Sequence, residues 1–180
     1  PSGKLPITFP RRWEDCSAYP TYKKESGITR YDEDIFVGYR HFEQANIPPR
    51  FAFGYGLSYS KFKADPPIVS SSQLSGQETI TVSTTIKNIS KVDGAEVVQL
   101  YVRDVASSLK RPDKELKGFK KVFLKAGESQ VVSFSLQPID LAFYDPGQKK
   151  WISEEGEFEI MLGSSSRPED LQKVSIKLVQ

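Results

Sequence analysis

The sequence is poor in the residue types on which most catalytic and metal sites depend. Its 180 residues include one cysteine, Cys16, and one histidine, His41. A single cysteine excludes an intrachain disulfide and is most often a small packing residue. With one histidine, a zinc site or a Ser-His-Asp triad would have only that residue to be built around. We therefore expect His41, which lies in an aromatic stretch, to be a partly buried hydrogen-bonding residue.

Long apolar runs and a strong charge excess are also lacking. No apolar run approaches the ~20 residues that a membrane helix requires, so we expect a protein that is not embedded in a membrane. The formal net charge is only +2. The nearest approach to a basic cluster is interrupted by Asp113 and Glu115, which favours a solvated strand face over a nucleic-acid-binding surface. Its members are Lys110, Arg111, Lys114, Lys117, Lys120, Lys121 and Lys125.

From Thr79 onward the dominant pattern is an alternation of apolar and polar residues, which is typical of strands with one buried and one solvent-facing side. Ile80, Val82, Thr84 and Ile86 share a face of the first run. Further runs follow at intervals of about ten residues, as in a β-sandwich or barrel. These runs span residues 97–102, 116–124, 132–136, 158–162 and 174–178.

The run at residues 97–102 is apolar on both faces, because Val97 and Tyr101 oppose the other apolar residues. That strand is predicted to be central or covered by a neighbour. With an edge strand at residues 68–74, we expect seven or eight strands. Trp151 follows a turn signal at residues 145–148 and is predicted to anchor the core or the end of a sheet.

Residues 1–66 differ in kind, because they hold 13 of the 21 aromatic residues and seven of the twelve prolines but few aliphatic residues. Such a segment covers another surface more readily than it builds a core. A short helix is expected at residues 34–44, with Asp32 as its cap. The sequence begins without an initiator Met or the apolar part of a signal peptide, so we interpret it as a piece of a longer chain.

The most conspicuous carboxylate cluster is Asp32, Glu33 and Asp34. Glycoside hydrolysis requires a pair of carboxylates, but the side chains of adjacent residues point in divergent directions. Helix capping or a salt bridge to Arg30 or Arg40 is therefore favoured. A second group of carboxylates lies on a turn and on the solvent face of a strand. The simpler explanation for these residues is that they keep the surface soluble. The group consists of Glu154, Glu155, Glu157 and Glu159.

Two short motifs have weak functional interpretations. Residues 51–59 contain Gly54 and Gly56 at a phosphate-loop spacing but lack the third glycine and the lysine of such loops. A tight turn that lets the flanking aromatic residues pack is favoured, and an aromatic strip that stacks on sugar rings is the alternative. Asn88-Ile89-Ser90 is an N-glycosylation sequon, which matters only if the chain is secreted.

Six stretches together give the sequence a specific resemblance. It resembles the C-terminal end of a glycoside hydrolase family 3 β-glucosidase, including the fibronectin type III-like domain of that family. The stretches before that domain are residues 3–10 (GKLPITFP), 31–40 (YDEDIFVGYR) and 51–59 (FAFGYGLSY). The stretches within it are residues 94–104 (GAEVVQLYVRD), 112–119 (PDKELKGF) and 156–163 (GEFEIMLG).

The resemblance implies a mainly β fold in two parts. Residues 67–180 are expected to form a fibronectin type III-like (immunoglobulin-like) antiparallel β-sandwich. Residues 1–66 are expected to be the largely irregular C-terminal tail of an α/β sandwich catalytic domain together with an interdomain connector. Their aromatic residues would then pack at the interdomain interface.

The resemblance also implies a parent enzyme that removes terminal β-linked glucose by a retaining mechanism, for which two carboxyl groups must lie ~5 Å apart. In the family both carboxyl groups belong to domains that precede residue 1 here. We therefore assign no catalytic, cofactor-binding or metal-binding residue to this chain, and we expect it to be inactive alone and to stabilise the upstream catalytic domains. Secretion and a cytoplasmic location both stay open.

Two other classes of protein are alternatives. A module that binds polysaccharide or another wall polymer would use exposed aromatic residues such as Tyr101, Tyr144 or the strip at residues 51–59. A free-standing adhesion-type fibronectin domain is disfavoured, because such a protein would not need residues 1–66.

Overall fold

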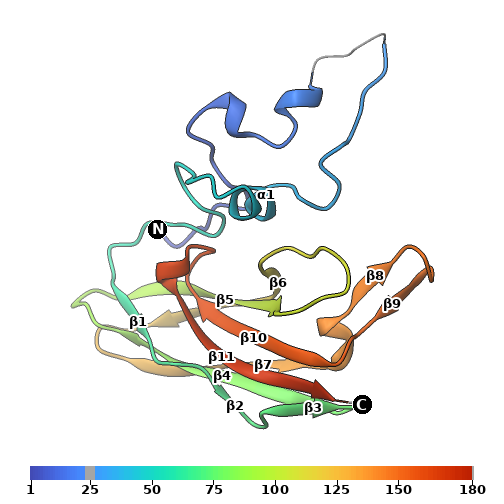
Figure 1. Ribbon diagram of the computed structural model, residues 1–180. Coiled ribbons are helices and arrows are strands. Elements are labelled where there is room, and N and C mark those ends of the chain that lie inside the picture. Colours follow the sequence, from blue (N-terminus) through green and yellow to red (C-terminus); the bar gives the residue numbers. More distant parts are fainter. Residues whose placement is uncertain (23–26, 180) are drawn as a thin grey trace.

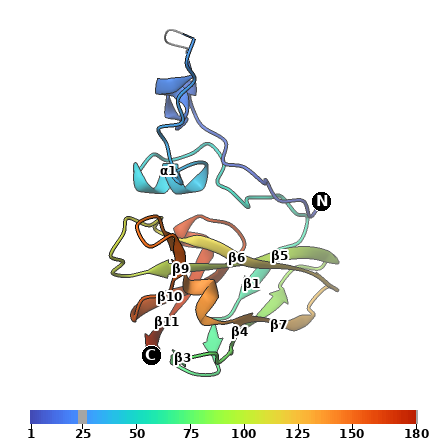
Figure 2. The ribbon, with the colours of Figure 1, turned by 90° about the vertical axis from the view of Figure 1, so that its right-hand side faces the viewer.

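The computed structural model describes residues 1–22 and 27–179. Two β-sheets pack face to face as a sandwich, and the N-terminal part of the chain lies over one of them (Figures 1 and 2). The predicted mainly β, antiparallel sandwich is thereby confirmed. No helix in these two ranges is long and apolar enough to cross a membrane.

The first sheet is built around the strand β4. Strands β1 and β2 pair with β4 along one edge, β7 pairs with it along the other, and all these pairings are antiparallel. The strands are β1 (Phe62–Ala64), β2 (Ile68–Val69), β4 (Ile80–Asn88) and β7 (Ser129–Leu136). The four residues that alternate in the first predicted run, from Ile80 to Ile86, are buried.

The second sheet has the strand order β3-β11-β10-β5-β6. Its neighbours are antiparallel except for β3 and β11, which are parallel. A β-bulge shifts the register of β5 against β6 between Leu100 and Tyr101. The strands are β3 (Gln73–Ser75), β5 (Gly94–Asp104), β6 (Glu115–Leu124), β10 (Gly156–Gly163) and β11 (Leu171–Val179).

The remaining elements are short. Strands β8 (Phe143–Asp145) and β9 (Lys150–Ile152) form a separate hairpin. The one α-helix of the described residues is α1 (Tyr39–Gln44). The 3₁₀ helices are η1 (Trp13–Asp15), η2 (Tyr19–Thr21), η3 (Pro138–Leu141) and η4 (Pro168–Asp170).

The core lies between the two sheets and is formed by aliphatic side chains with Phe158. Burying an aliphatic or phenyl side chain of this kind contributes ~1.5–3 kcal/mol, so the facing strand sides account for the stability of the sandwich. In β5, Val98, Leu100 and Val102 point into this core, and Tyr101 on the opposite face is also fully buried. The prediction that this strand is central or covered by a neighbour is confirmed, because β5 lies between β10 and β6.

Two local predictions are wrong. The helix begins at Tyr39 rather than near residue 34, and Asp32 does not cap it, because its N-cap is Gly38. Asp34 and Gly38 have φ values of 53° and 56°, and such left-handed backbone cannot continue a right-handed helix. Trp151 is 64% exposed. It lies in the β8–β9 hairpin and contacts Tyr144 edge to face at 5.9 Å instead of entering the core.

Candidate functional site: the interface between the N-terminal segment and the sandwich

The stretches that support the family resemblance meet at the outer face of the five-stranded sheet. The N-terminal segment denotes here the described residues of 1–61. Figures 1 and 2 show helix α1 of this segment above strands β5 and β10, on the side away from the core. The contacts described next join residues of the stretches 31–40, 51–59, 94–104 and 112–119.

Gln99 of β5 joins the sheet to the turn that contains Gly54. Its Nε2 donates to the carbonyl oxygens of Gly54 (3.3 Å) and Ser164 (2.8 Å), and its Oε1 accepts a hydrogen bond from the Tyr101 hydroxyl at 2.5 Å. Gly54 has a φ of +75°, and a Cβ atom there would lie 2.2 Å from Gln99 Oε1. The turn therefore approaches the sheet so closely that only glycine fits.

Tyr101 and Tyr39 form the aromatic centre of the interface. Their ring centroids lie 6.0 Å apart in an edge-to-face arrangement, and Tyr39 also packs on Phe53 at 5.0 Å. At the β-bulge, the backbone N–H of Leu116 donates to the Tyr39 hydroxyl oxygen at 3.0 Å. Burial raises the pKa of Tyr101 well above its ordinary value, so this hydroxyl remains a hydrogen-bond donor.

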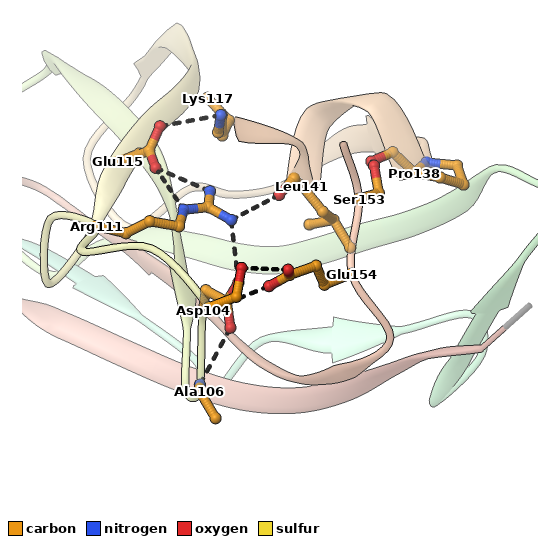
Figure 3. Close-up of polar contacts among 10 residues, drawn as sticks. Asp104, Ala106, Arg111, Glu115, Lys117, Pro138, Leu141, Ser153 and Glu154 are labelled. Atoms are coloured by element: carbon orange, nitrogen blue, oxygen red, sulfur yellow. Dashed lines mark hydrogen bonds and ion pairs between the residues drawn. The ribbon is translucent and has the colours of Figure 1, made fainter. Parts of the chain in front are cut away.

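Arg111 organises the loop between β5 and β6 (Figure 3). Its guanidinium pairs with Asp104 at 3.1 Å and with Glu115 at 2.8 Å, and it donates to the Leu141 carbonyl oxygen at 2.9 Å. It also lies over the Phe143 ring at 5.4 Å. Since only 5% of the Arg111 side chain is exposed, these partners fix the loop against the sandwich.

Glu115 extends this network to helix α1. Besides Arg111 it contacts Lys117 at 3.2 Å, and Arg40 of α1 lies 3.8 Å away. Burial opposes ionisation of Glu115, but the hydrogen bond from Arg111 and the charges of Lys117 and Arg111 together hold its pKa below the ordinary value. The carboxylate is thus a stable junction between the loop and the helix.

A second ion pair links the same helix and loop. Glu43 of α1 contacts Lys114 at 2.6 Å, and both side chains are largely buried. Burial raises the pKa of Glu43 to about 7, although the charge of Lys114 opposes this shift. The second carboxylate oxygen, Oε2, is buried without a hydrogen-bond partner among the described residues. Nearby, the Lys110 ammonium lies 4.8 Å from the centre of the Phe36 ring.

An open groove of about 780 Å³ runs between helix α1 and strands β10 and β11. Its charged lining is mostly paired, since Glu159 contacts Arg103 at 3.3 Å and Lys173 at 2.5 Å. The hydroxyl of Thr8 lines the groove and has no hydrogen-bond partner in the described part of the chain. No group of three or more His, Cys, Asp or Glu side chains in the described ranges is placed to hold a metal ion.

The structure confirms the predictions for His41 and for the Arg30–Asp32 pair and gives Glu159 a further role. His41 is partly buried and its Nε2 lies 3.1 Å from the Asp15 carbonyl oxygen, as predicted. The expected ion pair between Arg30 and Asp32 is present at 3.1 Å. Glu159 is more than a solubilising residue, because 16% of its side chain is exposed and it bridges two cations.

The basic cluster is divided by the fold. Arg111, Lys114 and Lys117 are used in the ion pairs just described. Lys120 and Lys121 are exposed strand residues. The predicted preference for a solvated strand face holds for the second group, whereas the first group is structural.

Asn88 of the sequon is completely buried. Its Nδ2 donates to the carbonyl oxygens of Val92 (2.8 Å) and Leu124 (3.1 Å), and its Oδ1 accepts hydrogen bonds from the backbone N–H and the hydroxyl of Ser90. Both donor hydrogens are therefore used. The sequon forms a structural junction, and a glycan on Asn88 is incompatible with this fold.

Several interface residues had little or no signal in the sequence. Gln99 is a polar residue in an otherwise apolar run, and that contrast is the one signal that could have identified it. Arg111 and the Glu43–Lys114 pair had none, because their partners come from distant parts of the chain.

Comparison with known proteins defines the class of the sandwich first. A family model described as a fibronectin type III-like domain matches residues 96–166, a range that includes most of β5 and all of β6, β7 and β10. The fold is therefore a fibronectin type III-like β-sandwich.

Whole relatives then define the family. The crystal structure of a GH3 β-glucosidase from Bifidobacterium adolescentis matches with a TM-score of 0.91 and 38% identity, over 99% of this chain and 26% of that chain. A thermostable β-glucosidase B of Acetivibrio thermocellus is 46% identical over 93% of this chain and 22% of its own length. A β-glucosidase of Bacteroides ovatus is 41% identical over 92% of this chain and 23% of its own length.

The chain belongs to glycoside hydrolase family 3 and matches a C-terminal portion of these β-glucosidases, with a fibronectin type III-like domain. It spans less than a quarter of the length of these two curated relatives.

Proposed function

We propose that this chain is the C-terminal structural module of a retaining β-glucosidase that hydrolyses terminal, non-reducing β-D-glucosyl residues. In this proposal, residues 67–180 are the fibronectin type III-like domain, and residues 1–66 are the tail of the α/β sandwich catalytic domain with the connector. The catalytic carboxylates belong to the upstream domains, and the module stabilises those domains.

The exposed apolar surface of the N-terminal segment supports this proposal most directly. Its largest exposed side chains include Tyr59 (83%), Tyr31 (81%), Leu57 (70%), Tyr22 (69%) and Ile28 (65%). Soluble proteins seldom expose large contiguous apolar patches unless these form interaction sites. Other residues of the same segment, Gly54 and Tyr39, fix it to the sandwich through Gln99 and Tyr101, so the segment combines attached residues with exposed apolar residues that are free to contact the catalytic domains.

Deletion of residues 67–180 from the parent enzyme tests the stabilising role. The deletion is expected to lower the melting temperature of the enzyme or to abolish its soluble expression, because it exposes the sheet-facing side of the N-terminal segment. A truncated enzyme with unchanged stability and unchanged kcat/KM would contradict the proposal.

The separated chain tests the assignment of catalysis to the upstream domains. Purified residues 1–180 are expected not to hydrolyse a chromogenic β-glucoside under conditions in which the parent enzyme does. Turnover by the separated chain, retained through repurification, would contradict this assignment.

A second candidate function is binding of polysaccharide or another wall polymer, which would keep the enzyme near its substrate. Tyr144 and Trp151 on the β8–β9 hairpin are 49% and 64% exposed, and aromatic rings of this kind can stack on sugars. Tyr101 cannot take this role, because it is completely buried.

A pull-down on insoluble cellulose, glucan and lignin tests the second function. Binding by the parent enzyme that a Tyr144→Ala/Trp151→Ala double variant loses would support it. Binding no stronger than that of a control protein with the same net charge would remove it.

A further inference from the structure

Strand β6 has an uncovered aromatic strip on its outer face. Phe119 and Phe123 are 70% and 62% exposed, and Lys121 between them is also exposed. Side chains alternate along a strand, and Val122 and Leu124 enter the core. Phe119, Lys121 and Phe123, which we name the β6 strip, therefore point away from the core.

The β6 strip is continuous with the interface already described. In the ladder between β5 and β6, Phe119 is the direct partner of Gln99, and directly opposite residues place their side chains on the same face of the sheet. Gln99 is buried beneath the turn of Gly54. The N-terminal segment thus covers the outer face at β5 and at the first residues of β6, where it contacts Glu115 and Leu116, and the β6 strip begins just beyond this cover.

A second copy of this chain is a poor occupant for the β6 strip. Antiparallel pairing of β6 with itself, in the register that places Phe119 opposite Phe123, also places Lys121 opposite Lys121. Like charges directly opposite each other destabilise strand pairs, and lysine on an edge strand is a common protection against such pairing. An occupant that neutralises Lys121 is favoured.

We propose that the β6 strip is a second contact surface for the upstream catalytic part of the parent β-glucosidase, whose contacting surface is apolar with a carboxylate opposite Lys121. This inference rests on the proposed function. It adds that the catalytic part reaches past the N-terminal segment and touches the sandwich directly. The two phenyl rings provide the apolar contact, and Lys121 provides the charge that specifies the partner.

Hydroxyl-radical footprinting of the full-length parent enzyme tests the contact without any substitution. Oxidation of Phe119 and Phe123, normalised to the intrinsic reactivity of phenylalanine, is expected to be several-fold lower than their exposure in this chain implies. Val131, which is 60% exposed on the other sheet, is the internal control and is expected to react fully. Full reactivity of both phenylalanines would overturn the inference.

The charge of the partner is tested by Lys121→Glu in the full-length enzyme, with Lys87→Glu on β4 as the matched control. The Lys121→Glu variant is expected to lower the melting temperature of the enzyme and to restore oxidation at Phe119, whereas the control changes neither. Equal effects of the two substitutions would contradict the proposal that a carboxylate of the partner lies opposite Lys121. The stabilising role of residues 67–180 and the contact of the β6 strip can fail separately. If the β6 strip proves to be uncovered, deletion of residues 67–180 can still destabilise the enzyme.

Discussion

Gly54 lies directly against the side-chain amide of Gln99, so a substitution at Gly54 tests this contact of the interface. Substitution Gly54→Ala adds a Cβ atom 2.2 Å from Gln99 Oε1 at a φ of +75°. Left-handed backbone costs a non-glycine residue ~1–2 kcal/mol, and the steric overlap adds to this cost. We expect a loss of more than ~2 kcal/mol in the free energy of unfolding, measured by urea denaturation.

Gly127→Ala is the matched control for that substitution. Gly127 has a φ of +79°, but nothing lies within 4 Å of its added Cβ atom. This variant is expected to show the backbone cost alone. Equal losses for the two alanine variants would mean that the close approach to Gln99 contributes nothing to stability.

Asn88 is the second residue for which a single substitution is informative. Replacement by alanine removes the Asn88 donor from the Leu124 carbonyl oxygen and the Asn88 acceptor from the Ser90 backbone N–H, whereas the Val92 carbonyl oxygen keeps the hydroxyl donors of Ser60 and Ser90. A buried polar group left without its hydrogen bond costs ~1–3 kcal/mol. Asn88→Ala is therefore expected to lower the melting temperature strongly in a thermal scan. Ser90→Ala, which removes only one hydroxyl, should have a much smaller effect.

The loop between β5 and β6 depends on one side chain for its attachment. Arg111→Met leaves the buried carboxylate of Asp104 and that of Glu115 without their shared cation. Breaking a buried ion pair in this way costs ~3–5 kcal/mol. We expect this loss in the free energy of unfolding from chemical denaturation. Lys117→Met removes a more exposed partner of Glu115 and should cost far less, so similar losses would contradict the central role of Arg111.

Helix α1 and the same loop should make stability depend on pH. The pKa of Glu43 is raised from 4.5 to about 7 in the folded protein. Between these values the folded protein binds more protons than the unfolded chain, so this group makes the free energy of unfolding fall as the pH rises through that window. Glu43→Gln is expected to flatten this slope in melting temperatures measured from pH 4.5 to 7.

Glu159→Gln is a control of opposite sign for that pH dependence. The hydrogen bond from Lys173 holds the pKa of Glu159 below its ordinary value of 4.5. The stability that Glu159 contributes is therefore present above pH 4.5 and is lost as the pH falls below it. This variant should change the dependence of the melting temperature on pH below pH 4.5. Between pH 4.5 and 7 the slope of the melting temperature against pH should equal that of the unsubstituted protein.

Most of the sandwich could be predicted at the level of elements, because long amphipathic strands such as β4 have a clear two-residue period. The short strands β1, β2, β8 and β9 have at most three residues each, which is too few for a period. Helix α1 was placed too early, because aromatic spacing does not reveal left-handed backbone at Asp34. Trp151 was predicted to anchor the core or the end of a sheet, since residue type alone does not show that its hairpin is separate from both sheets.

At the scale of the whole molecule, the apolar outer side of the N-terminal segment should control solution behaviour. We expect the separated chain to self-associate as its concentration rises, because Tyr31, Tyr59 and the neighbouring apolar residues are exposed. Sulfate strengthens apolar association and should increase the effect. Size-exclusion chromatography with light scattering measures it. A chain that stays monomeric at high concentration and in sulfate would contradict this expectation.

The interface shows where prediction from sequence ends. The aromatic and proline content of residues 1–66 predicted a segment that covers another surface, and in the structure part of this segment packs on the outer face of the sandwich. The contacts themselves were not predictable, since Gln99 meets Gly54 across 45 residues and Leu116 meets Tyr39 across 77 residues. No local pattern encodes such pairings, because each depends on the register of strands that are far apart in the sequence.

The parallel pairing of β3 with β11 has a consequence for the order of events during synthesis. Leu74 pairs with Leu178, so β3 leaves the ribosome about 100 residues before its partner in that sheet. At ~5–20 residues per second, β3 must wait roughly 5–20 s for that partner. Its length of three residues limits the unpaired edge that other nascent chains could join during this interval.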